Sequence, residues 1–240
     1  MKGLKELGKL YLIPTRLGDN PPLEVLPISI KKIIELVDDY IVENEKSARR
    51  FIKKICPRKP QPKLNLYPLN KYSKQEEIIS YLNPCLEGKN MGLLSEAGCP
   101  GIADPGADIV KLAHEQGIRV VPLVGPSSII LALMASGMNG QNFAFNGYLP
   151  IDLKEKRQAL KALEKKSAEE GQSQIFIETP YRNNKILEDL ISILHPDTRI
   201  CVASDLTLPT EFINTQSAGN WKKIKIDLHK RPSIFIIQKD

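Results

Sequence analysis

The stretch that decides the fold is MGLLSEAGCPGIADPGADIVKLAHEQGIRVVPLVGP, residues 91–126. It opens with a short apolar run, Met91 to Leu94, which follows turn residues and predicts a buried strand. Ser95 to Gly106 is a loop rich in glycine and proline, and a helical pattern from Ala107 to Gln116 follows it. Arg119 to Leu123 then predicts a second strand. Strand, loop, helix and strand in this order form the repeating unit of a parallel α/β sheet.

The loop from Ser95 to Gly106 carries three glycines and two prolines, and its only charges are Glu96 and Asp104. Glycine lets the main chain approach a ligand closely, and proline restricts the backbone. This composition predicts a rigid cradle at the carboxyl end of a strand, where open α/β sheets bind small molecules. A loop that only turns the chain is the alternative. The second loop, at Gly125 to Ser128, favours a binding site because it follows the next strand.

Composition sets broad limits on the chain. Its 240 residues, 42% of them hydrophobic, allow one large α/β domain or two small ones. No apolar run is long enough to cross a bilayer, and residues 1–5 do not resemble a secretory signal, so we expect a cytoplasmic protein. The four cysteines are scattered, with no histidine at ligand spacing, so we expect no disulfide and no metal. Cys99 lies in the cradle, where a small packing residue is its simplest role.

The net charge of +6 favours an anionic partner such as nucleic acid. Basic residues are densest at 47–63, 154–166 and 222–231. The second of these patches is explained equally well by a solvated helix face, because glutamates alternate with its lysines.

The first half alternates strands and helices, which predicts a mostly parallel sheet. The predicted strands are Lys9–Pro14, Asp39–Glu43, Leu64–Tyr67, Met91–Leu94 and Arg119–Leu123. Helices are expected at 28–37, 47–55, 73–86 and 107–116, the third opening with a capping box at Ser73 to Glu76. The loop after the first strand lacks a Gly-x-Gly-x-x-Gly pattern, so the usual dinucleotide site is not indicated.

The second half places its last strands close together, which predicts a mixed or antiparallel sheet. Strands are expected at 143–149, 174–178, 198–203, 210–214 and 233–238, with helices at 127–136, 152–170 and 183–194. Ser127 stands at the N-cap of the first of these helices, and Gly137 ends it. We predict two domains, 1–123 and 124–240, whose loops face each other across a cleft.

Several motifs, in order along most of the chain, resemble one family. They are SEAGCPGIADPG (95–106), VPLVGPSS (121–128), ASG (135–137), FNGYLP (145–150), FIETPYR (176–182) and ASDLT (203–207). This set is similar to the tetrapyrrole-methylase-like superfamily of S-adenosylmethionine-dependent methyltransferases. Within it, the chain most resembles the branch that methylates the 2′-hydroxyl of a cytidine in small-subunit ribosomal RNA.

The resemblance implies a two-domain class III methyltransferase architecture, S-adenosylmethionine held in the cleft, and a homodimer. Transferred position by position, the residues expected to bind the donor are Pro14, Ser95, Glu96, Ala97, Gly98, Ile102, Ser127, Ser128, Thr179, Ala203 and Pro232. No metal is needed, because methyl transfer from a sulfonium is a direct displacement that depends on positioning.

A ribose hydroxyl must also lose a proton. Glu43, Glu178 and Arg182 lie at predicted strand ends and are the candidate catalytic residues, although ordinary loop roles would also account for them. The chain departs from the branch in three places. It has Glu43-Asn44-Glu45-Lys46 where Glu-Asp-Thr-Arg is usual, and Glu96 where aspartate is usual. After Leu206-Thr207, where the branch usually has a basic or glutamate-bearing pattern, Leu208-Pro209-Thr210-Glu211 intervenes.

Three functions are therefore open. The first is methylation of RNA, with the basic patches near the acceptor, and the second is the same chemistry on a small molecule such as a tetrapyrrole. The third is a non-catalytic binding protein, which the altered residues 44–46 keep open.

Overall fold

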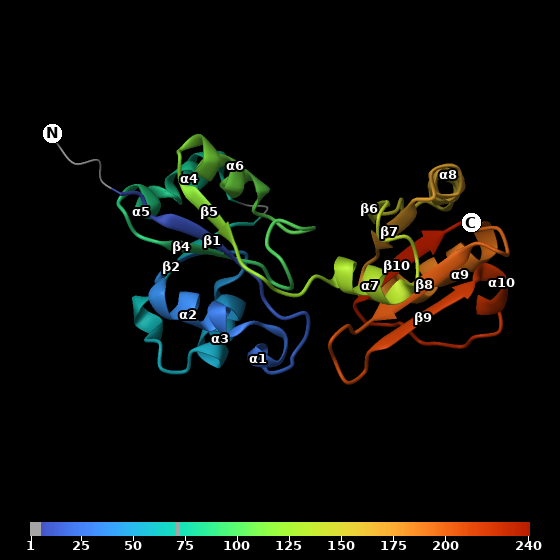
Figure 1. The fold of residues 1–240 in the computed structure, drawn as a ribbon, viewed down its shortest axis with the longest axis horizontal. Helices are drawn as coiled ribbons and strands as arrows, with labels where there is room; N and C mark the ends of the chain where they lie inside the picture. The colour runs from blue at the N-terminus through green and yellow to red at the C-terminus, as the bar shows by residue number, and fades with distance from the viewer. Residues whose placement is uncertain (1–5, 71–72) are drawn as a thin grey trace. The chain divides into compact units, whose positions relative to one another are not determined.

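The computed structural model describes residues 6–70 and 73–240 (Figure 1). Residues 1–5, on which the expectation about a secretory signal rests, lie outside the described part. The chain divides into two compact units, Met1–Pro126 and Ser127–Asp240. The domain boundary that we place after Leu123 stays a prediction.

The first unit is built on a five-stranded sheet in which every neighbouring pair is parallel. The strands lie in the order β3-β2-β4-β1-β5. Their bounds are β1 Lys9–Ile13, β2 Asp39–Val42, β3 Asn65–Pro68, β4 Met91–Leu94 and β5 Arg119–Pro122. This confirms the parallel sheet expected from the alternation of strands and helices.

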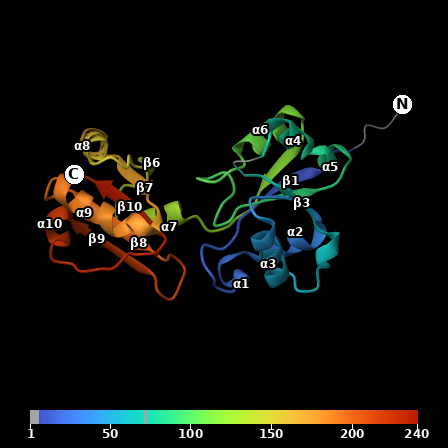
Figure 2. The same cartoon turned by 180° about the vertical axis from the view of Figure 1, so that it is seen from behind.

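Helices cover both faces of this sheet (Figures 1 and 2). One face packs against α1 (Pro22–Val25), α2 (Ile28–Leu36) and α3 (Glu45–Ile55), with Ile13, Tyr40 and Val42 in the shared core. The other packs against α4 (Gln75–Ser80), α5 (Asn83–Leu86) and α6 (Ala107–Glu115), with Leu10, Ile41 and Met91. A short 3-10 turn, η1 (Gln61–Lys63), precedes β3.

The single helix and capping box predicted for 73–86 are wrong. The segment breaks into α4 and α5, and Pro84 lies in the first turn of α5, where its missing N–H is tolerated. Lys74, not Ser73, occupies the N-cap of α4. The Ser73 hydroxyl instead donates to the Pro68 carbonyl (2.9 Å) and accepts from the Asn70 N–H (2.9 Å). Ser73 therefore closes the turn after β3.

The second unit has a mixed sheet of order β6-β7-β10-β8-β9, as expected. β6 (Phe143–Tyr148) and β7 (Ser173–Ile177) are parallel, whereas β10 (Ser233–Gln238), β8 (Arg199–Ser204) and β9 (Phe212–Ser217) pair antiparallel. α8 (Leu153–Glu170), α9 (Asn183–Ile193) and α10 (Ala218–Trp221) cover one face. α7 (Ser128–Ser136) packs against β8, β9 and β10, and η2 (Pro180–Arg182) leads into α9.

The strand predicted at 210–214 begins later, at Phe212. Thr210 stays in the preceding loop because its hydroxyl donates to Asp205 Oδ2 (3.0 Å). Arg231 donates to the same Asp205 oxygen (2.7 Å) and to the Thr210 carbonyl (2.6 Å), so it ties both ends of the loop together. The intervening residues 208–211 thus belong to a braced loop.

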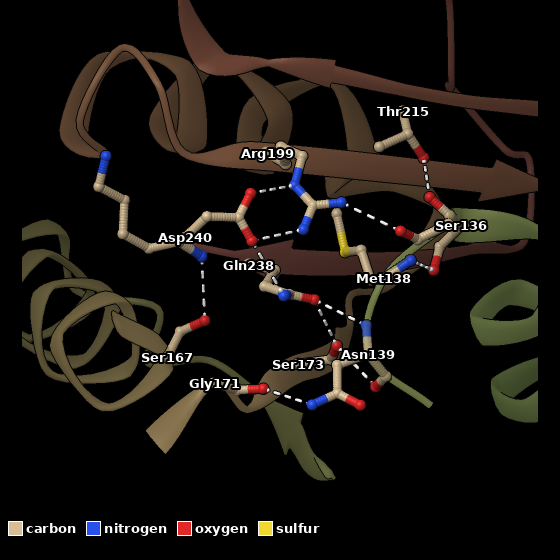
Figure 3. Close-up of polar contacts among 12 residues, drawn as sticks. Ser136, Met138, Asn139, Ser167, Gly171, Ser173, Arg199, Thr215, Gln238 and Asp240 are labelled. Carbon is tan, nitrogen blue, oxygen red and sulfur yellow. Dashed lines mark hydrogen bonds and ion pairs between the residues drawn. The ribbon is translucent and has the colours of Figure 1, made fainter. Parts of the chain in front are cut away.

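Polar contacts attach the α7–β6 connection to the sheet of the second unit (Figure 3). Arg199 makes a bidentate pair with Asp240 (2.8 and 2.6 Å) and donates to the Gly137 carbonyl (3.0 Å). Gln238 Oε1 accepts from the Asn139 N–H (2.8 Å) and from the Ser173 hydroxyl (3.0 Å). The C-terminal residues are therefore part of the folded unit.

Candidate functional site

The candidate site lies where the helices change from one face of the parallel sheet to the other. β1 and β4 are neighbours, with Ile13 opposite Leu94. The chain leaves β1 toward α1 and α2 on one face, and it leaves β4 toward α6 on the opposite face. Such a switch point opens a crevice at the carboxyl ends of the strands, where α/β sheets bind ligands.

Strand register places three of the predicted residues together at this crevice. Val42 and Ile13 both lie opposite Leu94. The residues that follow these strands, Glu43, Pro14 and Ser95, therefore leave the sheet side by side. Pro14 and Ser95 are buried, and Glu43 is half-buried.

The loop from Ser95 to Gly106 is held by its own hydrogen bonds and by its neighbours. The Ser95 hydroxyl donates to the Gly98 carbonyl (2.5 Å), which also accepts the Thr15 N–H (2.9 Å). The Cys99 thiol donates to the Pro126 carbonyl (3.4 Å). The loops after β1, β4 and β5 are thus connected to one another. Burial raises the pKa of Cys99, which keeps this thiol protonated and favours the packing role expected for it.

Two glycines are required by the geometry of these loops. Gly98 has φ +79°, a left-handed conformation that side chains rarely adopt. A Cβ on Gly125 would lie 2.2 Å from Pro14 Cβ, which no repacking of side chains alone would relieve. The close approach predicted from the composition is therefore present, and it joins the end of β5 to the end of β1.

Ala97 and Ile102 are exposed residues of the loop from Ser95 to Gly106.

Three carboxylates gather beside the cradle: Glu43, Glu96 and Asp104. Burial raises the pKa of Glu43, and the negative charges of Asp104 and Glu96 raise it further. Burial and Glu96 raise the pKa of Asp104 as well. Glu43 Oε1 and Asp104 Oδ2 are buried and have no hydrogen-bond partner among the residues that the structure describes. Buried unpaired acceptors at a crevice point to a ligand that brings donors or positive charge.

Ser47 and Asn44 connect α3 to the cradle. The Asn44 side chain caps α3 by accepting from the N–H groups of Lys46 (3.0 Å) and Ser47 (3.1 Å). The Ser47 hydroxyl reaches Glu96 Oε1 at 2.5 Å. Asn44 therefore has a structural role, and the Glu96 side chain has a partner on α3.

Four of the residues predicted in the second unit, Glu178, Thr179, Ala203 and Pro232, lie at one end of its inner strands. Ile234 is opposite both Ile177 and Ala203, so Glu178, Thr179 and Pro232 gather at the ends of β7 and β10. Ala203 is fully buried on β8. Ser127 occupies the N-cap of α7 without making a side-chain cap, and Ser128 begins the helix. The Ser127 hydroxyl is thus not used in capping.

Glu178 and Arg182 form a close pair. The side chain of Glu178 is 3% exposed, and Oε1 accepts from Arg182 Nη2 (2.6 Å) and from the Thr179 N–H (2.6 Å). Arg182 is 38% exposed, and its buried Nε has no partner in the described part of the chain. In this arrangement Glu178 orients Arg182, whose other guanidinium N–H groups can still donate to an acceptor.

Some residues of the site escaped the prediction. Asp104 carried a signal, because it is one of only two charges in the cradle loop. Thr15 and Ser47 carried none, since their partners Ser95 and Glu96 lie far away in the sequence. No group of three or more His, Cys, Asp or Glu side chains in the described residues is arranged to hold a metal ion.

Comparison with known proteins decides the family. The model of the tetrapyrrole (corrin/porphyrin) methylases matches residues 25–220. The chain belongs to the tetrapyrrole methylase family. Membership makes it a methyltransferase and implies S-adenosylmethionine as the methyl donor.

Curated relatives of this methylase share a name. A ribosomal RNA small subunit methyltransferase I from Escherichia coli O157:H7 is 31% identical over 96% of this chain and 78% of its own length. The protein of that name from Bacillus subtilis (strain 168) is 37% identical over 85% and 66%, and that from Thermotoga maritima is 32% identical over 86% and 87%.

Solved structures agree on the two-domain architecture. Diphthine synthase aligns over 96% of the methylase and 90% of its own chain, with a TM-score of 0.68 and 14% identity. The cobalt precorrin-4 methyltransferase CbiF aligns over 96% and 94%, with a TM-score of 0.61 and 17% identity. At these identities the likeness concerns the fold alone.

None of the helices in residues 6–70 and 73–240 combines the length and apolar character needed to cross a bilayer.

The site fits the implied donor in its chemistry. S-adenosylmethionine carries a sulfonium, an ammonium group and ribose hydroxyls, which favour nearby carboxylates, and its own carboxylate, which requires N–H donors such as those of the main chain. Glu43 and Asp104 supply unpaired carboxylate oxygens, and no Lys or Arg is ion-paired with Glu43, Glu96 or Asp104 in the described part of the chain. The close packing at Gly98 and Gly125, where no side chain intervenes, brings the main chain near these carboxylates.

Proposed function

We propose that this chain transfers a methyl group from S-adenosylmethionine to the ribose 2′-hydroxyl of a cytidine in small-subunit ribosomal RNA. The observation that carries the proposal is the cradle after β4, with unpaired carboxylate oxygens of Glu43 and Asp104 beside it. The names of the curated relatives support the choice of ribosomal RNA. The net charge of +6 suits an anionic substrate.

The proposed donor contacts are the positions that match the motifs of the family: Pro14, Ser95, Glu96, Ala97, Gly98, Ile102, Ser127, Ser128, Thr179, Ala203 and Pro232. When bound, the donor would supply an electrophilic methyl group on a cationic sulfur. The chain's own contribution is to hold the acceptor oxygen in line with that methyl group and to exclude water.

Proton removal is assigned to Glu43. Its unpaired Oε1 and raised pKa suit a general base better than an ordinary exposed carboxylate would. Arg182, oriented by Glu178, is proposed to contact the acceptor.

Mapping of methylated nucleosides by mass spectrometry tests this proposal. Small-subunit ribosomal RNA from cells with and without the gene should differ by one 2′-O-methylcytidine, and the purified chain should restore it when S-adenosylmethionine is added. Identical maps, together with no methyl transfer to the unmethylated RNA, would overturn the proposal.

A tetrapyrrole or other small molecule is the second candidate acceptor, and it is favoured by structural neighbours that act in corrin and porphyrin synthesis. Incubation with labelled donor and uroporphyrin III distinguishes the two, because only this alternative predicts a methylated porphyrin. The third candidate, a binding protein without transfer, is favoured by the altered residues 44–46. Calorimetric titration with the donor, followed by a transfer assay, separates it from both enzymes.

We also propose a homodimer, which sedimentation at several concentrations would test. An enzyme of ribosomal RNA would work in the cytoplasm, where its substrate lies.

A further inference from the structure

We infer that a groove between α3 and the β1–α1 loop is the path of the RNA backbone toward the methyl-transfer site. This inference rests on the proposed function and deepens it by naming the surface that the acceptor strand occupies. The groove has a volume of about 910 Å³, near the upper end of the range for ligand cavities, about 300–1,000 Å³.

The groove has two walls and a floor. Residues 15–19 form one wall, and residues of α3 between Ser47 and Lys54 form the other. Val42, Leu94 and Ser95 form the floor. Because these three residues stand at the carboxyl ends of β2 and β4, the groove leads directly from the candidate site.

Positive charge dominates the lining. Five cationic side chains border the groove and only two carboxylates do: the cations are Arg16, Arg49, Arg50, Lys53 and Lys54, and the carboxylates are Asp19 and Glu96. Asp19 neutralises part of this charge, since it pairs with Arg16 (2.7 Å) and Lys54 (3.0 Å). Both cations lower the pKa of Asp19, Lys54 more than Arg16, so this carboxylate stays ionised.

Arg50 and Lys53 are the cations that remain available. Both are exposed, and neither has an ion-pair partner among the described residues. They lie three residues apart on α3, so their side chains are neighbours on its surface, with Cβ atoms about 5–6 Å apart. Two unpaired cations at such a spacing suit neighbouring phosphates of an extended strand.

A solvated helix face is the ordinary explanation for a basic helix, and α8 illustrates it. There Lys161 pairs with Glu164 (2.8 Å) and Lys165 with Glu169 (3.7 Å), so that part of the positive charge is neutralised within the helix itself. On α3, Arg49 pairs with Glu45 (3.9 Å) and Lys54 with Asp19 (3.0 Å). What distinguishes α3 is that its unpaired cations Arg50 and Lys53 border a groove.

The inner end of the groove reverses in charge. Glu96 lines it, and burial together with the charge of Glu96 raises the pKa of both Glu43 and Asp104. Carboxylates repel phosphates and accept hydrogen bonds from hydroxyls. A strand lying along α3 would therefore keep its phosphates toward Arg50 and Lys53 and present a ribose hydroxyl toward Glu43. Charge alone thus orients the acceptor.

The test compares Arg50→Ala/Lys53→Ala with the control Lys89→Ala/Lys111→Ala, which removes the same charge elsewhere in the unit. Lys89 precedes β4, at the amino ends of the strands, and Lys111 lies on α6, on the other face of the sheet; their side chains are 62% and 76% exposed. The probes are an unmethylated small-subunit ribosomal RNA transcript, uroporphyrin III and S-adenosylmethionine, and the chain is used intact.

We expect the groove variant to bind the RNA at least tenfold more weakly, with donor affinity and thermal midpoint unchanged. Its salt dependence should also be shallower. Each lost phosphate contact on a single strand reduces the slope of log K against log salt by about 0.7, so two contacts reduce it by about 1.4. KM for RNA should rise while kcat at saturating RNA changes less than about twofold, and the control should match the unaltered chain.

Equal RNA affinity and equal salt slope in both double variants would overturn the groove while leaving the proposed function intact. Tight binding of uroporphyrin III that depends on Arg50 and Lys53 would assign the groove to a small polyanion and overturn the inference. Failure of the unaltered chain to bind or methylate the RNA would overturn the proposed function itself.

Discussion

The Ser47 hydroxyl donates to Glu96 Oε1 at 2.5 Å, which joins the first turn of α3 to the cradle after β4. Glu96 stands where the most similar branch of the family is expected to carry aspartate. Its additional methylene lets the carboxylate reach α3, and Asn44 fixes the turn that presents Ser47. Glu96 and Asn44, which both depart from the pattern expected for that branch, therefore act on the same contact between α3 and the cradle.

Ser47→Ala should lower the free energy of unfolding by about 0.5–1.5 kcal/mol, the usual net contribution of one hydrogen bond, because this contact is exposed to solvent. Glu96→Gln should cost less after Ser47→Ala than before it, since the two residues share the contact. Urea unfolding of the double-mutant cycle measures this. Ser80→Ala is the control, because among the described residues that hydroxyl bonds only to the Glu77 carbonyl of its own helix. Additive effects of the two changes would contradict a direct coupling.

Glu43→Gln should slow methyl transfer by about 10²–10⁴-fold, the usual contribution of a general base. A base must be deprotonated, so the rate of the unaltered chain should rise with pH through an apparent pKa above the ordinary 4.5, because burial and the neighbouring carboxylates raise the pKa of Glu43. The variant should lose this rise. Single-turnover rates across pH measure both effects.

Glu87→Gln is the matched control for Glu43→Gln, since it removes an exposed carboxylate that precedes β4, at the amino ends of the strands. An unchanged pH profile in Glu43→Gln would remove Glu43 from the proposed proton transfer and leave the donor contacts untouched.

Gly125→Ala should destabilise the first unit by about 1–3 kcal/mol, the usual cost of overpacking. The new Cβ would overlap the Pro14 ring, at 2.2 Å from Pro14 Cβ, and would separate the ends of β1 and β5. Donor affinity measured by calorimetry should fall as well. Gly140→Ala is the control, because its Cβ would meet nothing within 4 Å; equal stability of the two variants would contradict the close approach.

Asp189→Asn should lower the free energy of unfolding by about 3–5 kcal/mol at neutral pH, because it leaves the Lys156 ammonium buried without a counter-charge. The two side chains are 4% and 8% exposed and lie 2.8 Å apart. Lys185→Ala, which removes an exposed partner of Asp189 at 3.0 Å, should cost less than about 1 kcal/mol.

The effect of Asp189→Asn should depend on pH. Burial by itself would raise the pKa of Asp189, but hydrogen bonds from Lys156 and Lys185 outweigh it and hold the pKa below the ordinary 3.8. A carboxylate with a lowered pKa stabilises the fold above its unfolded value and loses that contribution as the pH falls through its folded value. The difference in free energy of unfolding between Asp189→Asn and the unaltered chain should therefore shrink below about pH 3.8. A difference that stays constant with pH would contradict this role of the Asp189 charge.

Much of the architecture follows from local patterns. Short apolar runs gave β4 and β10 with their observed bounds, and the alternation of strands with helical patterns gave a parallel sheet in the first half. Gly137 ends α7 in the left-handed conformation that glycine adopts readily. The ordered motifs from Ser95 to Thr207 gave the family. These features depend on neighbouring residues, whose spacing is visible along the chain.

Long-range contacts set the rest. The pairing of Ile13 and Val42 with Leu94 brings Pro14, Glu43 and Ser95 together, although they are far apart along the chain. The burial that raises the pKa of Asp104, the reach of Glu96 to Ser47 and the unpaired charge of Arg50 and Lys53 likewise exist only once β2, β4 and α3 have packed. Residue order specifies which groups are present, whereas strand register and packing determine their distances and exposure to water, on which their chemistry depends.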